Sequence, residues 1–130
     1  MLETQLSTFK DHLGEIAPQG RTMLLPALLR AQKEFGFISK ENATKIGNAL
    51  RTPLADVMGV TEFYSMLHSE PTAETIIRVC TSPSCSARGG RSVHEELLHQ
   101  LDLLEDGATA DGKYYVEEAP CLGLCDKAPS

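Results

Sequence analysis

Tryptophan is absent from this chain of 130 residues, and the other aromatic residues are few, with four Phe and three Tyr. A core of this size must therefore consist mainly of Leu, Ile, Val, Met and Ala. Basic residues are also scarce, since 12 Lys and Arg stand against 18 Asp and Glu and the formal net charge is −6. This deficit argues against nonspecific binding to a phosphate backbone, so we expect no nucleic-acid partner.

Long apolar stretches and a signal sequence are missing as well. The longest apolar stretches, such as Met23–Leu29, fall far short of the ~20 residues that span a bilayer. The N-terminus has no basic segment followed by an apolar one, so we expect neither secretion nor direct membrane insertion. We therefore predict a cytoplasmic protein, in which cysteines more often hold a metal or do redox work than form structural disulfides.

The first half of the chain has the residue spacing of helices. Apolar residues recur every three or four positions in a first helix, at Leu2, Leu6, Phe9, Leu13 and Ile16. Three further helices are predicted from capping residues and prolines, with starts at Thr22, Ser39 and Thr52-Pro53 and an end of the second helix at Phe35-Gly36. The inner faces of these helices are expected to carry Leu24, Leu25, Leu28, Leu29 and Ala31, then Ala43, Ile46 and Leu50, then Val57, Met58, Val60, Phe63 and Met66. We therefore expect a helical bundle over residues 1–70.

Residues 71–130 have a different pattern. Thr75–Cys80 is short, apolar and β-branched, which predicts a buried strand, and Tyr114–Glu118 predicts a second strand. Between them Ser92 and Glu95 match a capping box, which would begin a helix lined by Val93, Leu97, Leu98, Leu101 and Leu104. This order predicts an α/β unit with a cysteine pair at the end of each strand. Because two strands make a marginal sheet, we expect the sequence to lack a C-terminal segment that completes it.

The four cysteines form two close pairs. Cys80 and Cys85 enclose four residues, and Cys121 and Cys125 enclose three. Two such loops at one end of a sheet can present four thiolates to one metal centre. The spacing favours a [2Fe–2S] cluster, in which each of two irons takes two thiolates. Structural zinc, whose usual loops enclose two residues, and disulfides or free thiols remain open alternatives.

Other polar residues are weaker candidates for a site. None of the histidines, His12, His68, His94 and His99, lies two residues from a cysteine, so we predict surface helix positions for them. Three basic residues lie close to the cysteines in the sequence, at Arg88, Arg91 and Lys127. They either stabilise the negative charge of a metal centre or are ordinary surface residues. Gly89-Gly90 leads directly into the predicted helix, so the N-terminus of that helix could face the first cysteine loop.

Motifs along essentially the whole chain carry a family resemblance. They are Leu24–Leu29, Glu34–Ile38 and Val57–Tyr64 in the first half, and Val79–Cys85, Arg88–Gly90 and Cys121–Pro129 in the second. In these motifs the chain resembles the thioredoxin-like [2Fe–2S] ferredoxin subunits of NADH:quinone oxidoreductase (respiratory complex I) and related subunits of NAD-linked hydrogenases and formate dehydrogenases. The resemblance implies an α+β or α/β fold, with a thioredoxin-like domain over residues 71–130 behind the helical bundle.

The resemblance also implies a cofactor and an activity. It places Cys80 and Cys85 on one iron of a [2Fe–2S] cluster and Cys121 and Cys125 on the other, with no catalytic residue in this chain. The chain would carry electrons as a subunit of an NADH dehydrogenase. Its partners would be a subunit that binds FMN and oxidises NADH, and further iron–sulfur subunits, in a complex at the inner face of the cell membrane.

Two departures and two alternatives accompany this hypothesis. Relatives continue past the final Ala-Pro with more strands and a helix, and they often carry a small residue where this chain has Glu62. The first alternative is the equivalent diaphorase subunit of a hydrogenase or formate dehydrogenase. The second, more remote, is an interaction module held together by zinc.

Overall fold

The structure is a computed structural model that describes residues 2–130, with side chains described from residue 4 onward. The side chain of Leu2, which we expected on the inner face of the first helix, lies outside the described residues. The chain divides into two compact units, one that ends at Pro71 and one that spans Thr72–Ser130. Over the described residues, no helix has the length and apolar character that crossing a membrane requires.

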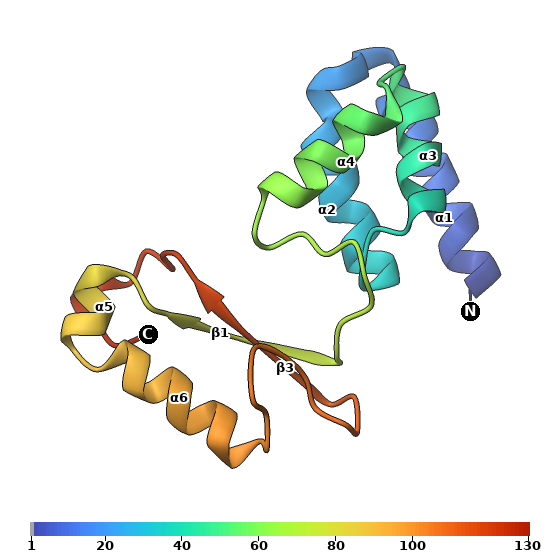
Figure 1. The fold of residues 1–130 in the computed structure, drawn as a ribbon. Coiled ribbons are helices and arrows are strands. Elements are labelled where there is room, and N and C mark those ends of the chain that lie inside the picture. The colour runs from blue at the N-terminus through green and yellow to red at the C-terminus, as the bar shows by residue number, and fades with distance from the viewer. Residues whose placement is uncertain (1) are drawn as a thin grey trace. The chain divides into compact units, whose positions relative to one another are not determined.

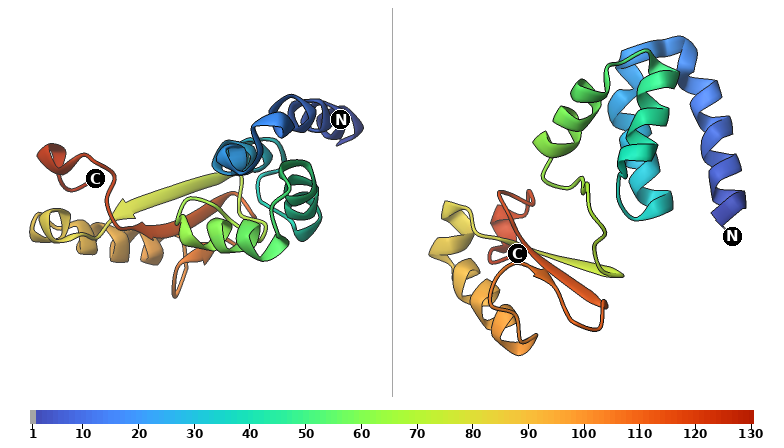
Figure 2. Two further views of the ribbon diagram at one scale, coloured as in Figure 1. Left: turned by 90° about the horizontal axis from the view of Figure 1, so that it is seen from above. Right: turned by 45° about the vertical axis from the view of Figure 1, so that its right-hand side comes forward.

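The first unit is helical, as its periodicity predicts. It contains α1 (Leu2–Ile16), the 3-10 segment η1 (Ala17–Met23), α2 (Leu24–Phe35), α3 (Lys40–Leu50) and α4 (Leu54–Phe63). Helix α2 contacts α1, α3 and α4, and the four helices can be followed in Figures 1 and 2. The largest fully buried side chains between them are those of Phe9, Leu28, Ile38, Ile46 and Leu50. This unit therefore has a hydrophobic core of its own.

Two of the predicted helix boundaries are confirmed. Ser39 caps α3, because its Oγ accepts a hydrogen bond of 3.1 Å from the Asn42 N–H. Helix α2 ends at Gly36, which adopts φ of 81°, a left-handed conformation that glycine takes without steric cost. The sequence alone therefore predicts a helix boundary where a nearby side chain caps the helix or a glycine ends it.

Two predicted caps are wrong. Helix α2 begins after Met23 rather than Thr22, whose Oγ1 donates instead to the carbonyl of Gln19 at 2.9 Å. Pro53, and not Thr52, occupies the N-cap of α4. Thr52 is buried, and its hydroxyl donates back to the carbonyl of Leu50 at 3.3 Å. In both cases the hydroxyl donates to a carbonyl that precedes it in the chain, so it does not cap the following helix.

Four residues of the first unit that were assigned to inner faces are exposed instead. Leu6, Leu29, Phe63 and Met66 are 37%, 52%, 80% and 47% exposed. Helix α4 ends at Phe63, and Tyr64 has extended backbone angles, so the helical spacing no longer applies at Met66. The ring of Phe63 packs edge-on against Tyr64, with 5.2 Å between centroids, rather than against the other helices.

The second unit is a small three-stranded sheet with helices. It contains β1 (Thr75–Cys80), α5 (Pro83–Ala87), α6 (Gly90–Gln100), β2 (Gly107–Ala108), β3 (Tyr114–Ala119) and the 3-10 turn η2 (Cys125–Lys127). The sheet order is β1-β3-β2, with β1 parallel and β2 antiparallel to β3. Helix α6 packs against both long strands and is the crossover between them (Figure 1). The predicted strand–helix–strand unit is therefore confirmed.

Details of the crossover differ from the prediction. Helix α6 begins at Gly90, two residues before the expected Ser92 cap, and it has no side-chain cap. It ends at Gln100, so Leu104 lies beyond the helix and is fully exposed rather than on its inner face. Val93, which was also expected on that face, is 43% exposed. The sequence did not indicate α5 or the two-residue strand β2, because each is too short to show a periodic pattern.

The segment after α4 is held to α2 by one side chain. The amide of Gln32 donates to the carbonyl of Met66 at 2.5 Å and accepts from the His68 N–H at 2.7 Å. The carbonyl of His68 in turn accepts from the Ile38 N–H at 2.7 Å. Gln32 thus satisfies backbone groups that no regular element pairs.

We predict that Gln32→Ala lowers the free energy of unfolding by about 1–2 kcal/mol, because two hydrogen bonds to the backbone are lost. The measurement is urea denaturation of the full chain followed by circular dichroism. The control is Gln100→Ala, which removes one exposed hydrogen bond of 2.9 Å to Glu96 within α6 and should cost much less. A smaller loss for Gln32→Ala than for the control would contradict the role of Gln32.

Candidate metal centre

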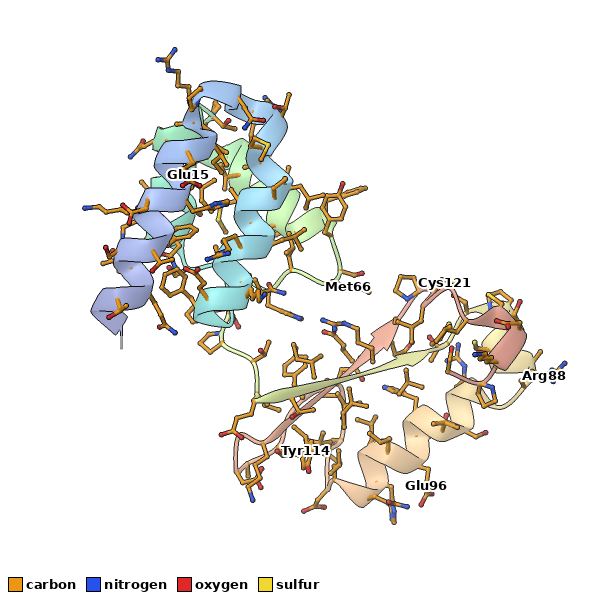
Figure 3. All side chains as sticks on the ribbon, turned by 180° about the vertical axis from the view of Figure 1, so that it is seen from behind. Glu15, Met66, Arg88, Glu96, Tyr114 and Cys121 are labelled. Carbon is orange, nitrogen blue, oxygen red and sulfur yellow. The ribbon has the colours of Figure 1, made fainter. Side chains whose placement is uncertain are left out.

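The two cysteine pairs lie at one edge of the sheet. Strand β1 ends at Cys80 and β3 ends at Ala119, which is the partner of Cys80 in the parallel register. Cys121 follows Ala119 by two residues, and α5 carries Cys85. In Figure 3, Cys121 and Arg88 lie at one end of this unit, and Tyr114, at the start of β3, lies toward the other. The strand order thus brings together two loops that are distant in the sequence.

The first pair is buried. Cys80 and Cys85 are each 1% exposed. The N–H of Ser82 donates to the Cys80 sulfur and is the main cause that lowers the pKa of this thiol. Burial alone would raise that pKa. Hydrogen bonds from the side chains of Cys85 and Ser82 and from the Leu122 N–H lower it further. Because Leu122 belongs to the other loop, the thiolate of Cys80 is stabilised by both loops.

The second pair is exposed. The sulfurs of Cys121 and Cys125 are 4.0 Å apart, and the Gly123 N–H points to the Cys121 sulfur at 3.4 Å. Gly123 adopts φ of 72°, which lets the chain turn between the two cysteines. Two sulfurs bound to one tetrahedral metal at about 2.3 Å lie about 3.8 Å from each other. The second pair is therefore already spaced to share one metal ion.

The four sulfurs influence one another electrostatically. The pKa of Cys125 is raised, chiefly by its hydrogen bond with Cys121 and by the charge of that thiolate, with smaller contributions from burial and from Cys85 and Cys80. Over the described residues, no three His, Cys, Asp or Glu side chains close around a single point. The donors therefore form two pairs that repel each other when deprotonated, and a bound cationic centre would relieve this repulsion.

The start of α6 forms the back of the first loop. A Cβ added to Gly90 would lie 2.5 Å from the carbonyl oxygen of Cys80 and 3.0 Å from that of Cys85. Only glycine permits this approach of the helix to both cysteines. The expectation that the helix begins against the first cysteine loop is therefore confirmed. The nearby bases Arg88, Arg91 and Lys127 are exposed, as ordinary surface residues are.

The donor set fits a [2Fe–2S] cluster. It offers thiols in two pairs on two loops, which suits two irons with two thiolates each. It also offers backbone N–H groups directed at sulfur, from Ser82 and Leu122 to Cys80 and from Gly123 to Cys121. Such N–H groups stabilise negative charge on the sulfurs of iron–sulfur centres.

Comparison with known proteins agrees with this donor chemistry. The model of the thioredoxin-like [2Fe-2S] ferredoxin family matches residues 10–130. The chain belongs to this family. Its cofactor is accordingly a [2Fe–2S] cluster, and the expectation of a thioredoxin-like fold with a helical N-terminal part is confirmed.

Individual relatives are similar over most of the chain, and each is one subunit of an NADH-quinone oxidoreductase. The relative from Pseudomonas aeruginosa is 39% identical over 128 residues, which cover 98% of this chain and 76% of the relative. The relative from Aquifex aeolicus is 34% identical, covering 98% of this chain and 78% of the relative. The relative from Thermus thermophilus is 34% identical, covering 92% of this chain and 67% of the relative.

One residue near the site was misplaced by sequence reasoning. His94 is only 6% exposed, not a surface position, and its ring contacts Asp106 and Glu118. The available signal was its spacing, because His94 precedes Leu97, Leu98 and Leu101 by three, four and seven residues and so shares their face of α6. The sequence did not identify Asp106 and Glu118 as its partners, because they come close to His94 only when the sheet has formed.

We predict that Gly90→Ala lowers both the cluster content of the purified chain and the stability of the metal-free chain. The added methyl group would force α6 away from the carbonyls of Cys80 and Cys85, at a cost of about 1–3 kcal/mol. Visible absorbance per chain and urea denaturation measure the two effects. The control is Gly59→Ala in α4, where a Cβ meets nothing within 4 Å. Equal behaviour of the two variants would contradict this account of Gly90.

We predict that the metal-free chain forms thiolates in separated steps. The lowered pKa of Cys80 makes its thiolate form before that of an ordinary thiol as pH rises, and the raised pKa of Cys125 makes its thiolate form after. Cluster uptake, which removes all four protons, should therefore improve with rising pH until Cys125 is deprotonated. Ultraviolet absorbance of thiolates measures the steps. Cys80→Ser should remove the early step, and Cys125→Ser the late one; a single unshifted step in the unaltered chain would contradict the prediction.

Proposed function

We propose that this chain is the [2Fe–2S] electron-transfer subunit of an NADH-quinone oxidoreductase, and that Cys80, Cys85, Cys121 and Cys125 hold its cluster. The names of relatives that are similar over nearly the whole chain support the first part. The assignment of the four cysteines is supported by one observation: β1 and β3 end at the same edge of the sheet, and a thiol pair lies at each of these ends. Cys80 and Cys85 bind one iron, and Cys121 and Cys125 bind the other.

The chain's own residues determine how the cluster is held. The buried pair is fixed by β1, α5 and the start of α6, while the exposed pair lies on a loop turned at Gly123. When bound, the cluster accepts and returns one electron at a time. Backbone N–H groups at the sulfurs stabilise the charge that this electron adds. The exposed second loop leaves one side of the site accessible to an electron donor or acceptor.

The proposal includes partner subunits. A neighbouring subunit carries FMN and oxidises NADH, further iron–sulfur subunits take up the electrons, and the complex lies at the inner face of the cell membrane. Exposed apolar side chains on the first unit support assembly with other proteins, since Leu29, Phe63, Tyr64 and Met66 are 43–80% exposed. Three of these residues, with Leu25 and Leu67, line one shallow apolar groove.

Cysteine replacement tests the cluster assignment. We predict that Cys80→Ser, Cys85→Ser, Cys121→Ser and Cys125→Ser each abolish or deform the visible spectrum of the anaerobically purified chain. Two irons and two sulfides per chain are expected in the unaltered protein, together with a paramagnetic resonance signal after one-electron reduction. The matched control is Ser84→Ala, which changes an exposed side chain in the first loop and should leave the spectrum intact.

Three results would contradict the proposal. An unchanged spectrum in any one of the four variants would remove that cysteine from the ligand set. A colourless chain that contains one zinc ion would favour the structural zinc module instead. Subunits that co-purify with the chain identify its complex, and a hydrogenase or formate dehydrogenase among them would exclude the quinone-linked assignment.

A further inference from the structure

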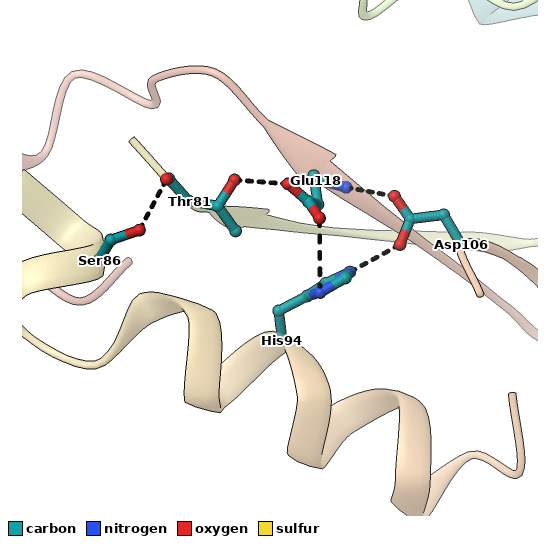
Figure 4. Close-up of polar contacts among 5 residues, drawn as sticks. All are labelled: Thr81, Ser86, His94, Asp106 and Glu118. Atoms are coloured by element: carbon teal, nitrogen blue, oxygen red, sulfur yellow. Dashed lines mark hydrogen bonds and ion pairs between the residues drawn. The ribbon is translucent and has the colours of Figure 1, made fainter. Parts of the chain in front are cut away.

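A buried histidine joins helix α6 to strand β3 through two carboxylates (Figure 4). The Nε2 atom of His94 lies 2.6 Å from Oδ1 of Asp106, and Nδ1 lies 3.8 Å from Oε1 of Glu118. The other oxygen of Asp106 accepts a hydrogen bond of 2.8 Å from the backbone N–H of Glu118. Asp106 therefore links the imidazole ring directly to β3.

The same network continues to the first cysteine loop. The second carboxylate oxygen of Glu118 accepts a hydrogen bond of 2.6 Å from Oγ1 of Thr81. The carbonyl of Thr81 accepts from Oγ of Ser86 at 2.7 Å. Thr81 follows Cys80 in the sequence, and Ser86 follows Cys85. The network therefore ends on the two residues next to the buried cysteines, as Figure 4 shows.

The ring of His94 is buried, whereas the carboxylates of Asp106 and Glu118 are partly exposed. The contact of 2.6 Å with Asp106 is a hydrogen bond, and the contact of 3.8 Å with Glu118 is too long to be one. The bond to the buried ring therefore holds the carboxylate of Asp106, which in turn accepts from the backbone N–H of Glu118.

We propose that His94 is a positioning residue for the iron–sulfur cluster: with Asp106 it holds Glu118, and Glu118 holds Thr81 and the loop of Cys80 and Cys85. This inference rests on the proposed assignment of those two cysteines as cluster ligands. The hydrogen bonds of this network fix the backbone of the loop that carries both cysteines.

Two pairs of variants in the full chain with its cluster test the proposal. Thr81→Val removes the hydroxyl donor at nearly constant shape, and Thr81→Ser keeps it. His94→Leu removes the hydrogen bond to Asp106, whereas His94→Gln keeps an N–H that can reach Asp106. The control is His99→Leu, an exposed position on the same helix. The measurements are the rate of cluster loss to an iron chelator and the midpoint potential in a redox titration.

We expect Thr81→Val and His94→Leu to lose the cluster about tenfold faster than the unaltered chain, with Thr81→Ser and His94→Gln close to it. Thr81→Val and His94→Leu should also shift the midpoint potential, because the N–H groups of the loop would move relative to the cluster. Thr81→Ser, His94→Gln and His99→Leu should match the unaltered chain in both measurements. If His94→Leu fails to fold, the Thr81 pair still decides whether the network positions the loop.

The proposal is overturned if these variants lower only the unfolding free energy and leave the loss rate and potential unchanged, because the network would then serve only to stabilise the fold. It is also overturned if Thr81→Ser loses the cluster as fast as Thr81→Val. Failure of the cysteine assignment would give a different result. In that case the Cys80→Ser or Cys85→Ser variant would keep the visible spectrum of the unaltered chain.

Discussion

The parallel pairing of β1 with β3 is the constraint on which the metal centre depends. Parallel strands end at the same edge of a sheet, and the register sets Cys80 opposite Ala119. A shift of one residue would turn every side chain of β3 to the other face. Val116 would leave the core, and Glu118 would turn away from α6. The burial of one apolar face of the sheet therefore also determines where the cysteines meet.

The crossover between these strands has a second consequence. Any parallel pair needs a long connection, and here that connection is α5 and α6. Because α6 begins at Gly90, directly against the carbonyls of Cys80 and Cys85, the helix that covers the sheet also supports the first loop. No comparable element packs behind the second loop within residues 121–130, where the cysteines are exposed. The centre thus combines a buried cysteine pair and an exposed one.

The sequence predicted the parts of this arrangement that depend on local pattern. The two long strands and the cysteine pairs at their ends follow from β-branched runs and spacing, and Ser39 was identified because its cap is local. Ser92 failed as a cap because a tertiary contact at Gly90 starts the helix earlier. His94 failed as a surface residue because its partners lie 12 and 24 residues away and meet it only in the folded sheet. Both of these misses depend on tertiary contacts, which a local sequence pattern does not show.

Charge at the centre must be considered locally rather than for the whole chain. Four thiolates, two sulfides and two ferric ions are together negative, and the chain itself has a formal net charge of −6. Exposed bases such as Arg88 offer little compensation, because water and salt screen them. The backbone N–H of Gly123 lies at hydrogen-bond distance from the Cys121 sulfur, and the backbone N–H of Ser82 lowers the pKa of Cys80. Such groups are fixed in the folded loops and lose no orientation when an electron arrives. A negatively charged protein can therefore hold a negatively charged cluster, since fixed dipoles at the sulfurs outweigh distant charges.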